Sequence, residues 1–222
     1  MNVTQAVGER RSIRQFLDKP VPEELLNSLL EKASRSPSGG NLQPWYIHAV
    51  TGDSLTRLKD VMDKAIEANP NGEGGEYNFY PDPMPEKYQA RNFKSAGDMY
   101  DLLGISRDEE LMRAAVKARN WEFFGAPVGL FFSLDNIMAS NQWAHIGMYM
   151  QTLALLAVEH GLGTCMQEAW AIYTPTIRSF LDLPDDRLFY CGMALGYVDP
   201  DAPVNTLVTE REPLENFVTF MK

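Results

Sequence analysis

The sequence predicts a single domain of the α+β class. Segments whose apolar residues recur with a helical period alternate along the chain with short runs of β-forming residues. The 222 residues contain no internal repeat and no linker between two self-sufficient halves. With 45% hydrophobic and 23% charged residues, the chain is able to bury an ordinary core. We therefore expect residues 1–222 to form one globular domain.

The first expected helix covers residues 22–33, because its apolar side chains share one helical stripe and a proline with two glutamates suits its start. The Pro and Gly residues of segment 36–40 then force an irregular loop. Residues 45–50 are rich in β-forming side chains and predict a strand. Residues 53–68 are typical of a helix, with Asp53 as its expected N-cap.

The remaining elements are predicted in the same way, from the periodicity of the apolar residues and from the Gly and Pro residues that interrupt it. Residues 69–84 have no period and predict a long surface loop, and such loops are often functional. Gly161 and Gly163 suit the end of a helix. Periodicity predicts helices over residues 86–103, 107–124, 140–160 and 175–181. Runs of β-forming residues predict strands over residues 128–134, 164–168 and 188–195.

The tail over residues 200–222 has little periodicity, yet it is too apolar for a free disordered end. We expect it to pack on its own domain or on a partner subunit. Its apolar residues include Leu207, Val208, Leu214, Phe217, Val218 and Phe220.

The charge balance is acidic, since 20 lysines and arginines against 30 aspartates and glutamates give a net charge of −10. A general nucleic-acid or anionic-membrane surface is therefore not expected, and a bound anion needs a local cluster of cations. The chain has only two cysteines, Cys165 and Cys191, which are too few for disulfide bonds to stabilise a chain of this length. This favours a reducing compartment. The start lacks the pattern of a secretory signal, and residues 143–158 are too short and polar for a membrane span. These features predict a cytoplasmic protein.

Three arginines in five residues, Arg10, Arg11 and Arg14, form such a cation cluster. Guanidinium groups stay charged and present forked donors that match phosphate oxygens, and Ser12 adds a hydroxyl and a backbone N–H. A phosphate-bearing ligand fits this cluster. A solvated basic end that helps solubility fits it as well.

The connection over residues 36–45 is a second candidate site. Its glycines let backbone N–H groups approach a ligand, while Asn41 and Gln43 offer amides that both donate and accept. This mixture suits the edge of a flat heterocycle such as the pyrimidine part of a flavin. An ordinary helix-to-strand turn selects the same residue types, so composition alone does not rank the two.

Two further segments have an equally ordinary explanation. In residues 161–170 the glycines are explained as caps, with Met166 and Trp170 as core residues. Arg211 is explained by a surface ion pair with a neighbouring glutamate.

We expect neither a catalytic triad nor a metal site, because the three histidines are scattered and each is expected to be structural. They are His48, His145 and His160.

In this order and at this chain length, these segments together resemble the nitroreductase family of FMN-dependent oxidoreductases. The resemblance lies in residues 10–14, 36–45 and 161–165 and in the tail from Gly196 to Pro213. The middle of the chain is also similar to the subgroup of nitrobenzoate-type reductases. The resemblance implies a nitroreductase-like α+β fold with a central mixed or antiparallel sheet flanked by helices. It also implies an interlocked homodimer with exchanged C-terminal tails and FMN at the subunit interface.

The resemblance assigns roles to individual residues. Arg14 matches the basic residue near the N1 and O2 edge of the flavin, where a fixed cation favours the reduced ring. The phosphate would be held by Arg10, Arg11, Ser12 and Arg211. The loop contributed by the other subunit matches Pro37, Ser38, Gly39, Asn41 and Gln43. The segment under the ring matches Met166, Gln167, Glu168 and Ala169.

The chain departs from some relatives at three positions in or beside these segments. Met166 and Ala169 stand where those relatives have Pro and Gly. Thr209 stands where they have Lys, which leaves one cation fewer for the phosphate.

The implied activity is a two-step exchange through one site. NADH or NADPH gives hydride to flavin N5, and a nitroaromatic or a quinone then takes its place and is reduced. No side chain is expected to act as a nucleophile or metal ligand. Two alternatives are reductive dehalogenation or other flavin chemistry on the same fold, and flavin binding without turnover. Residues 69–103, which are expected to cover the pocket, are the region that discriminates between the substrates.

Overall fold

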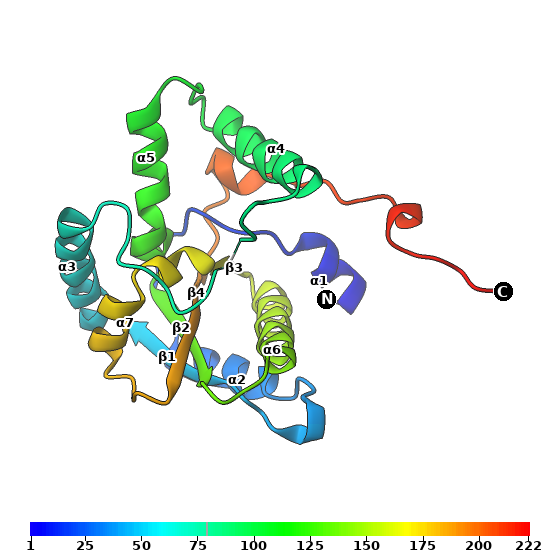
Figure 1. Ribbon diagram of the computed structural model, residues 1–222, viewed down its shortest axis with the longest axis horizontal. Coiled ribbons are helices and arrows are strands. Elements are labelled where there is room, and N and C mark those ends of the chain that lie inside the picture. The colour runs from blue at the N-terminus through cyan, green and yellow to red at the C-terminus, as the bar shows by residue number, and fades with distance from the viewer. Residues whose placement is uncertain (79) are drawn as a thin grey trace.

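The computed structural model describes residues 1–78 and 80–222, so Phe79, within the loop expected over residues 69–84, lies outside the described residues. A four-stranded sheet with the order β1-β2-β4-β3 forms the centre of the molecule (Figure 1). All three strand pairs are antiparallel, which confirms the expected sheet in its antiparallel form. The strands are β1 (Tyr46–Thr51), β2 (Val128–Asp135), β3 (Leu162–Gln167) and β4 (Arg187–Tyr197).

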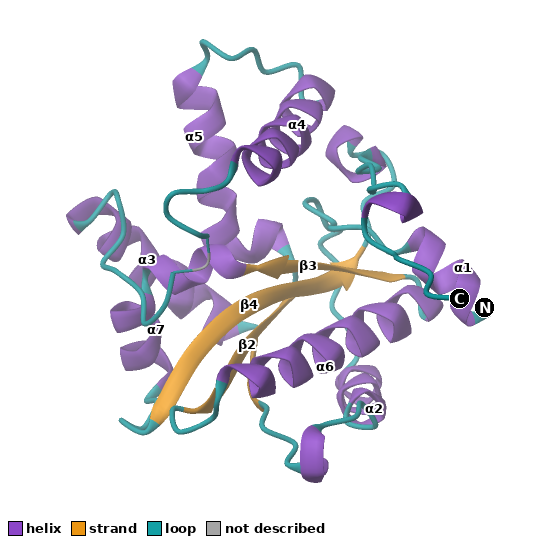
Figure 2. Cartoon of the chain, turned by 45° about the vertical axis from the view of Figure 1, so that its right-hand side comes forward, coloured by secondary structure: helices purple, strands orange, loops and turns teal. Residues whose placement is uncertain are grey.

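The helices confirm most of the expected elements. They are α1 (Val3–Glu9), α2 (Glu23–Ala33), α3 (Asp53–Ala68), α4 (Glu86–Leu102), α5 (Glu110–Ala118), α6 (Ser140–Glu159) and α7 (Thr174–Leu181). In both views, α4 and α5 stand above one end of the sheet (Figures 1 and 2). The first of these helices, α1, was not expected from the sequence. No helix in the described part of the chain is long and apolar enough to cross a membrane.

Three local predictions are wrong. The helix expected over residues 107–124 ends as α5 at Ala118 and continues as a 3₁₀ turn, because Phe123 and Phe124 adopt φ of 49° and 56°. Gly52, not Asp53, is the N-cap of α3, and its φ of 51° favours glycine. Gly163 does not close α6 but lies inside β3. Gly161, with a φ of 70°, ends α6 as expected.

The sheet separates two hydrophobic clusters. Strand β2 contributes residues to both clusters, because its side chains alternate between the two faces of the sheet. Leu130, Phe132 and Leu134 pack with α2 and α6, whereas Phe131 packs with α3 and α7. This explains why β2 reads as a continuous apolar run. The buried face of α6 belongs to the first of these clusters through Ile146, Met150, Leu153 and Ala157, so these residues are core within one chain.

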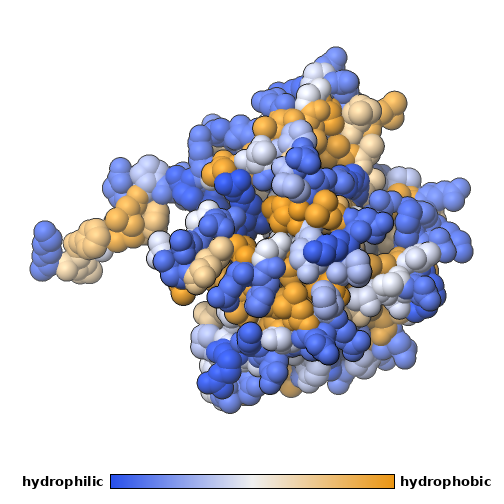
Figure 3. All heavy atoms as spheres, turned by 180° about the vertical axis from the view of Figure 1, so that it is seen from behind, coloured by the Kyte–Doolittle hydropathy of each residue, from blue (hydrophilic) through white to orange (hydrophobic). Residues whose placement is uncertain are grey.

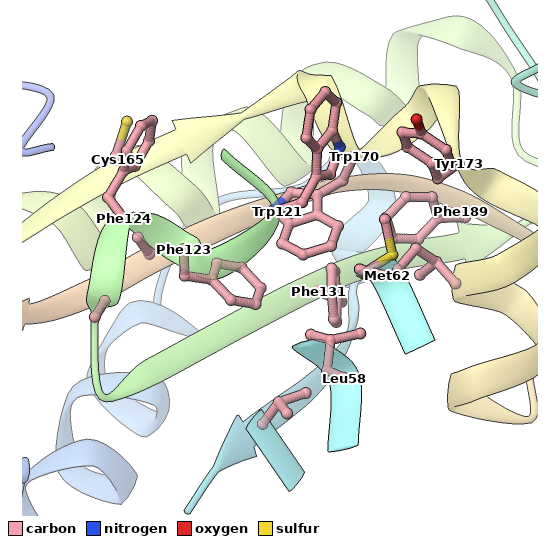
Figure 4. Packing of buried hydrophobic residues seen from close by; sticks show 14 of the residues in the cluster. Leu58, Met62, Trp121, Phe123, Phe124, Phe131, Cys165, Trp170, Tyr173 and Phe189 are labelled. Carbon is pink, nitrogen blue, oxygen red and sulfur yellow. The ribbon is translucent and has the colours of Figure 1, made fainter. Parts of the chain in front are cut away.

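Trp170 is the centre of the second cluster (Figure 4). Its ring lies 4.6 Å from Phe123 and 4.9 Å from Phe131, measured between ring centroids. Glycine at position 192 leaves room for it, since a Cβ there would lie 2.4 Å from Trp170 Cδ1. The expectation that Trp170 is a core residue is thus confirmed. The ring anchors the end of the segment 166–169 to the core.

Candidate functional site

The arginine-rich segment after α1 runs beside β3. The backbone N–H of Ile13 donates to the carbonyl of Thr164 at 2.9 Å, and Ser12 forms a parallel bridge with the same residue. A Cβ on Gly163 would lie 2.5 Å from Ile13 Cγ1. Glycine at position 163 therefore allows the segment to lie against the strand, which places the candidate cations at one edge of the sheet.

A cavity of about 270 Å³ lies between this edge of the sheet and the pair of helices α4 and α5. Arg14, Cys165 and Met166 line it from below. Residues of α4, α5 and the following turn line it from above, and they are Asn92, Ser95, Ala96, Met99, Tyr100, Val116, Lys117, Asn120 and Phe124. Ligand pockets for molecules of cofactor size usually measure about 300–1,000 Å³, so this cavity lies just below the lower end of that range.

The Cys165 thiol shows how closely the basic segment approaches this cavity. Burial raises the pKa of the thiol, and the charge of Arg14 acts against that shift, as do a hydrogen bond from Ser12 and the charge of Arg10. Three of the residues expected to bind one ligand therefore influence the pKa of the same thiol. The thiol itself stays protonated near neutral pH.

The segment 166–169 sends its side chains to different places. Met166 is 38% exposed and lines the cavity, so its explanation as a core residue is wrong. The Gln167 side chain is buried, and its Nε2 donates to the carbonyl of Asn120 at 2.7 Å, while its Oε1 has no hydrogen-bond partner among the described residues. Glu168 lies near Tyr77 and Tyr190, and partial desolvation raises the pKa of its carboxyl group.

Arg211 lies in a hollow of about 140 Å³ between the tail and α4. Its guanidinium donates to the hydroxyl of Thr209 at 2.7 Å and to the carbonyl of Glu210 at 2.8 Å. The carboxylates on either side pair with α4 instead, Glu210 with Lys94 at 3.4 Å and Glu212 with Arg91 at 2.8 Å. The expected ion pair between Arg211 and a neighbouring glutamate is therefore wrong.

The cation cluster is not neutralised by the acidic chain around it. Among the ion pairs of residues 1–78 and 80–222, none involves the four candidate arginines, Arg10, Arg11, Arg14 and Arg211. The charge of these groups is available to a bound anion.

The loop after α2 is shaped by its own backbone and by α6. Asn41 and Gln43 adopt φ of 55° and 49°, and the N–H of Gln43 donates to Ser38 Oγ at 2.9 Å. The N–H of Gly39 donates to Nε2 of His145 on α6 at 3.3 Å. Pro37, Gly39, Asn41 and Gln43 are exposed, and the side-chain amide of Gln43 donates to the carbonyl of Asn41 at 3.1 Å.

One chain does not bring this loop to the arginine segment. Figure 2 shows the turn at residues 39–41 below α6, whereas β3, beside which the arginine segment runs, lies above that helix. Two groups of candidate residues are thus formed by the chain but held apart. A site that needs both groups requires a second copy of the chain.

Two residues that the sequence did not single out belong to the site. Asn120 lines the cavity and holds Gln167, and Asn205 accepts a hydrogen bond from the backbone N–H of Arg14 at 2.9 Å. Neither lies in a recognisable motif, because each acts on a partner that is distant in sequence.

Comparison with known proteins identifies the family. The family model described as the nitroreductase family matches residues 7–197. The chain belongs to the nitroreductase family. The expected nitroreductase-like α+β fold is confirmed by the solved structure of the FMN and NADPH-dependent nitroreductase NfnB from sphigopyxis sp. strain HMH. That structure matches 100% of both chains with a TM-score of 0.97 and 40% sequence identity.

Two full-length relatives of this nitroreductase-family chain are also known. Nitrobenzene nitroreductase of Ectopseudomonas oleovorans is 36% identical over 219 residues, covering 99% of this chain and 96% of the relative. The 4-nitrobenzoate reductase of Pseudomonas putida is 37% identical over 218 residues, covering 97% and 93%. The expected similarity to nitrobenzoate-type reductases is thereby confirmed.

Proposed function

We propose that the chain is an FMN-dependent oxidoreductase that uses NAD(P)H to reduce nitroaromatic or quinone substrates. The observation that carries this proposal is the cavity between β3 and α4–α5, with Arg14 at its base and uncompensated arginines beside it. Such a site suits a ligand that combines an anionic group with a flat polar ring. The full-length relatives, named as nitroreductases, support the same activity.

The residues present fit FMN. Arginine side chains and a serine hydroxyl match a phosphate, and we propose that Arg10, Arg11, Ser12 and Arg211 hold it. Asn120, which lines the same cavity as Arg14 and Met166, has an amide oxygen that can accept a hydrogen bond from a donor on a bound ligand. A ring with N–H groups at its edge supplies such a donor.

We propose the following roles for the chain's own residues around the ring. Arg14 places a fixed positive charge at the N1 and O2 edge, which stabilises negative charge that develops there. The backbone of Met166, Gln167, Glu168 and Ala169 lies under the ring and orients it. Helices α4 and α5 cover the cavity and exclude water from it. When bound, FMN itself supplies the hydride chemistry.

We further propose that residues 1–222 form one FMN-binding domain that works as a homodimer, with the tail from residue 200 wrapping the partner subunit. Figure 3 shows the end of the tail projecting from the body with apolar side chains along it. Phe217, Phe220 and Met221 are 68%, 73% and 94% exposed in the single chain. Exposed apolar surface of this kind marks an interface.

The loop after α2 supports the same dimer. We propose that Pro37, Ser38, Gly39, Asn41 and Gln43 complete the site of the partner, since within one chain they lie away from the cavity. An apolar groove of about 220 Å³ between α1 and α6, lined by Val3, Ala6, Leu155 and Leu156, is a further surface that a partner would cover. We also propose a cytoplasmic location, supported by two cysteines that are both free and buried.

Dehalogenation and flavin storage are less well supported than reduction of nitroaromatics. Relatives that match nearly the whole chain are named for the reduction of nitrobenzene and nitrobenzoate. We propose that residues 69–103 select among flat aromatic substrates.

Product analysis tests the proposed function. Purified protein with FMN and NADPH is incubated separately with a nitrobenzoate, a quinone and a halophenol under one set of conditions. We expect NADPH-dependent conversion of the nitro compound and the quinone without release of halide. Halide release without conversion of the nitro group would contradict the proposal and favour the dehalogenase.

A further inference from the structure

We propose that Asn205 is a positioning residue that holds Arg14 in the place from which it acts on the flavin. This inference rests on the proposed function of the site. Asn205 lies at the start of the tail, 191 residues from Arg14 in sequence, and touches the cavity only through Arg14.

The Asn205 amide is buried and its hydrogen-bonding groups are used. Oδ1 accepts from the backbone N–H of Arg14 at 2.9 Å. Nδ2 donates to the carbonyl of Gln15 at 2.8 Å and to the carbonyl of Asp199 at 2.9 Å. Only 8% of the residue is exposed, so water does not readily replace these partners. One side chain therefore joins the arginine segment, the exit of β4 and the tail.

These bonds fix the backbone from which the Arg14 side chain extends. The guanidinium of Arg14 bonds back to its own segment, from Nη1 to the carbonyl of Ser12 at 3.1 Å. On one side the segment is fixed to β3 by Ile13. On the other side it is fixed by Asn205 together with a longer bond from the N–H of Asp199 to the carbonyl of Gln15 at 3.3 Å. If the Asn205 amide is removed, the backbone N–H of Arg14 loses its acceptor, while the backbone bonds made by Ile13, Gln15 and Leu17 remain.

The amide is suited to this task by having both an acceptor and two donors on one short side chain. Aspartate has the same shape and keeps the acceptor for Arg14, but it cannot donate to Gln15 and Asp199. Alanine loses all three bonds and leaves the backbone N–H of Arg14 without its acceptor. Asn205→Asp therefore removes two of the three hydrogen bonds, and Asn205→Ala removes all three.

The test compares the midpoint potential and the dissociation constant of bound FMN in wild type, Asn205→Ala, Asn205→Asp, Arg14→Met and the double variant Asn205→Ala/Arg14→Met. Thr206→Val is the matched control, because Thr206 is in the same turn and, among the described residues, its hydroxyl bonds only within that turn, to the carbonyl of Pro203 at 2.8 Å. FMN binding is measured by titrating apoprotein and following flavin fluorescence. The potential is measured by equilibration with a reference dye.

We expect Asn205→Ala to make bound FMN harder to reduce, in the same direction as Arg14→Met and by at least half as much. The double variant should match Arg14→Met alone, because the effect of Asn205 passes through Arg14. The dissociation constant of Asn205→Ala should rise at least tenfold, that of Asn205→Asp less, and that of Thr206→Val less than threefold. A merely structural role would lower stability without moving the potential.

The inference is overturned if Asn205→Ala keeps the wild-type potential, or if its effect adds fully to that of Arg14→Met. If Asn205→Ala does not give folded protein, Asn205→Ser, which also lacks the amide acceptor and donors, takes its place in the same cycle with the same criteria. Failure of the proposed function is a different result, since wild-type apoprotein would then not bind FMN at all.

Discussion

Replacing Arg14 with methionine is expected to slow the reduction of bound flavin by NADPH on the order of 100-fold, the usual effect of removing one fixed group that stabilises developing charge. Arg14 is half-buried and lines the cavity, and its only side-chain hydrogen bond in the described residues is to the carbonyl of Ser12. Methionine keeps much of the length and removes the charge. Some FMN should remain bound, because the proposed phosphate ligands are intact.

The measurement is the anaerobic, single-turnover loss of oxidised-flavin absorbance after mixing with excess NADPH. Arg57→Met is the matched control, since Arg57 is an exposed arginine on α3 that bonds only to Ser54 nearby. It should reduce at the wild-type rate. Reduction of Arg14→Met at the wild-type rate would show that the Arg14 charge does not act on the ring.

Ending the chain after Thr206 is expected to give monomer or aggregate without flavin. The 3₁₀ turn Pro203–Thr206, with buried Val204 and Asn205, is kept, so the core of the single chain stays intact. What is lost is Arg211 and the apolar end of the tail, including Phe217 and Phe220. The proposed subunit contact and one proposed phosphate ligand disappear together.

Size-exclusion chromatography with light scattering measures the loss of the dimer. The visible absorbance of the protein peak measures the loss of bound flavin. Arg211→Met in the full chain separates them, because it should weaken FMN binding while the dimer remains. A truncated protein that elutes as a yellow dimer would refute the wrapping tail.

Most of the fold could be predicted because its signals are local. The α2 stripe, the β-forming run of β2 and the long apolar helix α6 each depend on residues within one segment. The errors arise where a contact with a residue far away in sequence determines the local structure. Gly163 looked like a cap but is required by Ile13, which lies against β3 from the other end of the chain. Phe123 and Phe124 leave the helical region of φ, and Phe123 is buried against Phe131 and Trp170.

The candidate site could be predicted only in part, for the same reason. The arginines and the amides of the loop are conspicuous in an acidic sequence. Asn120 and Asn205 are not, since their partners Gln167 and Arg14 lie 47 and 191 residues away. The separation of the arginine segment from the loop after α2 was implied only by the family resemblance, because composition and periodicity do not place two segments relative to each other. In the structure the turn at residues 39–41 and β3 lie on different sides of α6.

Anaerobic titration of the purified flavoprotein with NADPH and with NADH tests whether a nicotinamide reduces the bound flavin. We expect stoichiometric loss of oxidised-flavin absorbance with at least one of the two nicotinamides, and its recovery when a nitrobenzoate is added without oxygen. Oxidised-flavin absorbance that persists in the presence of both nicotinamides would contradict the account, because the chain would then bind flavin without reducing it.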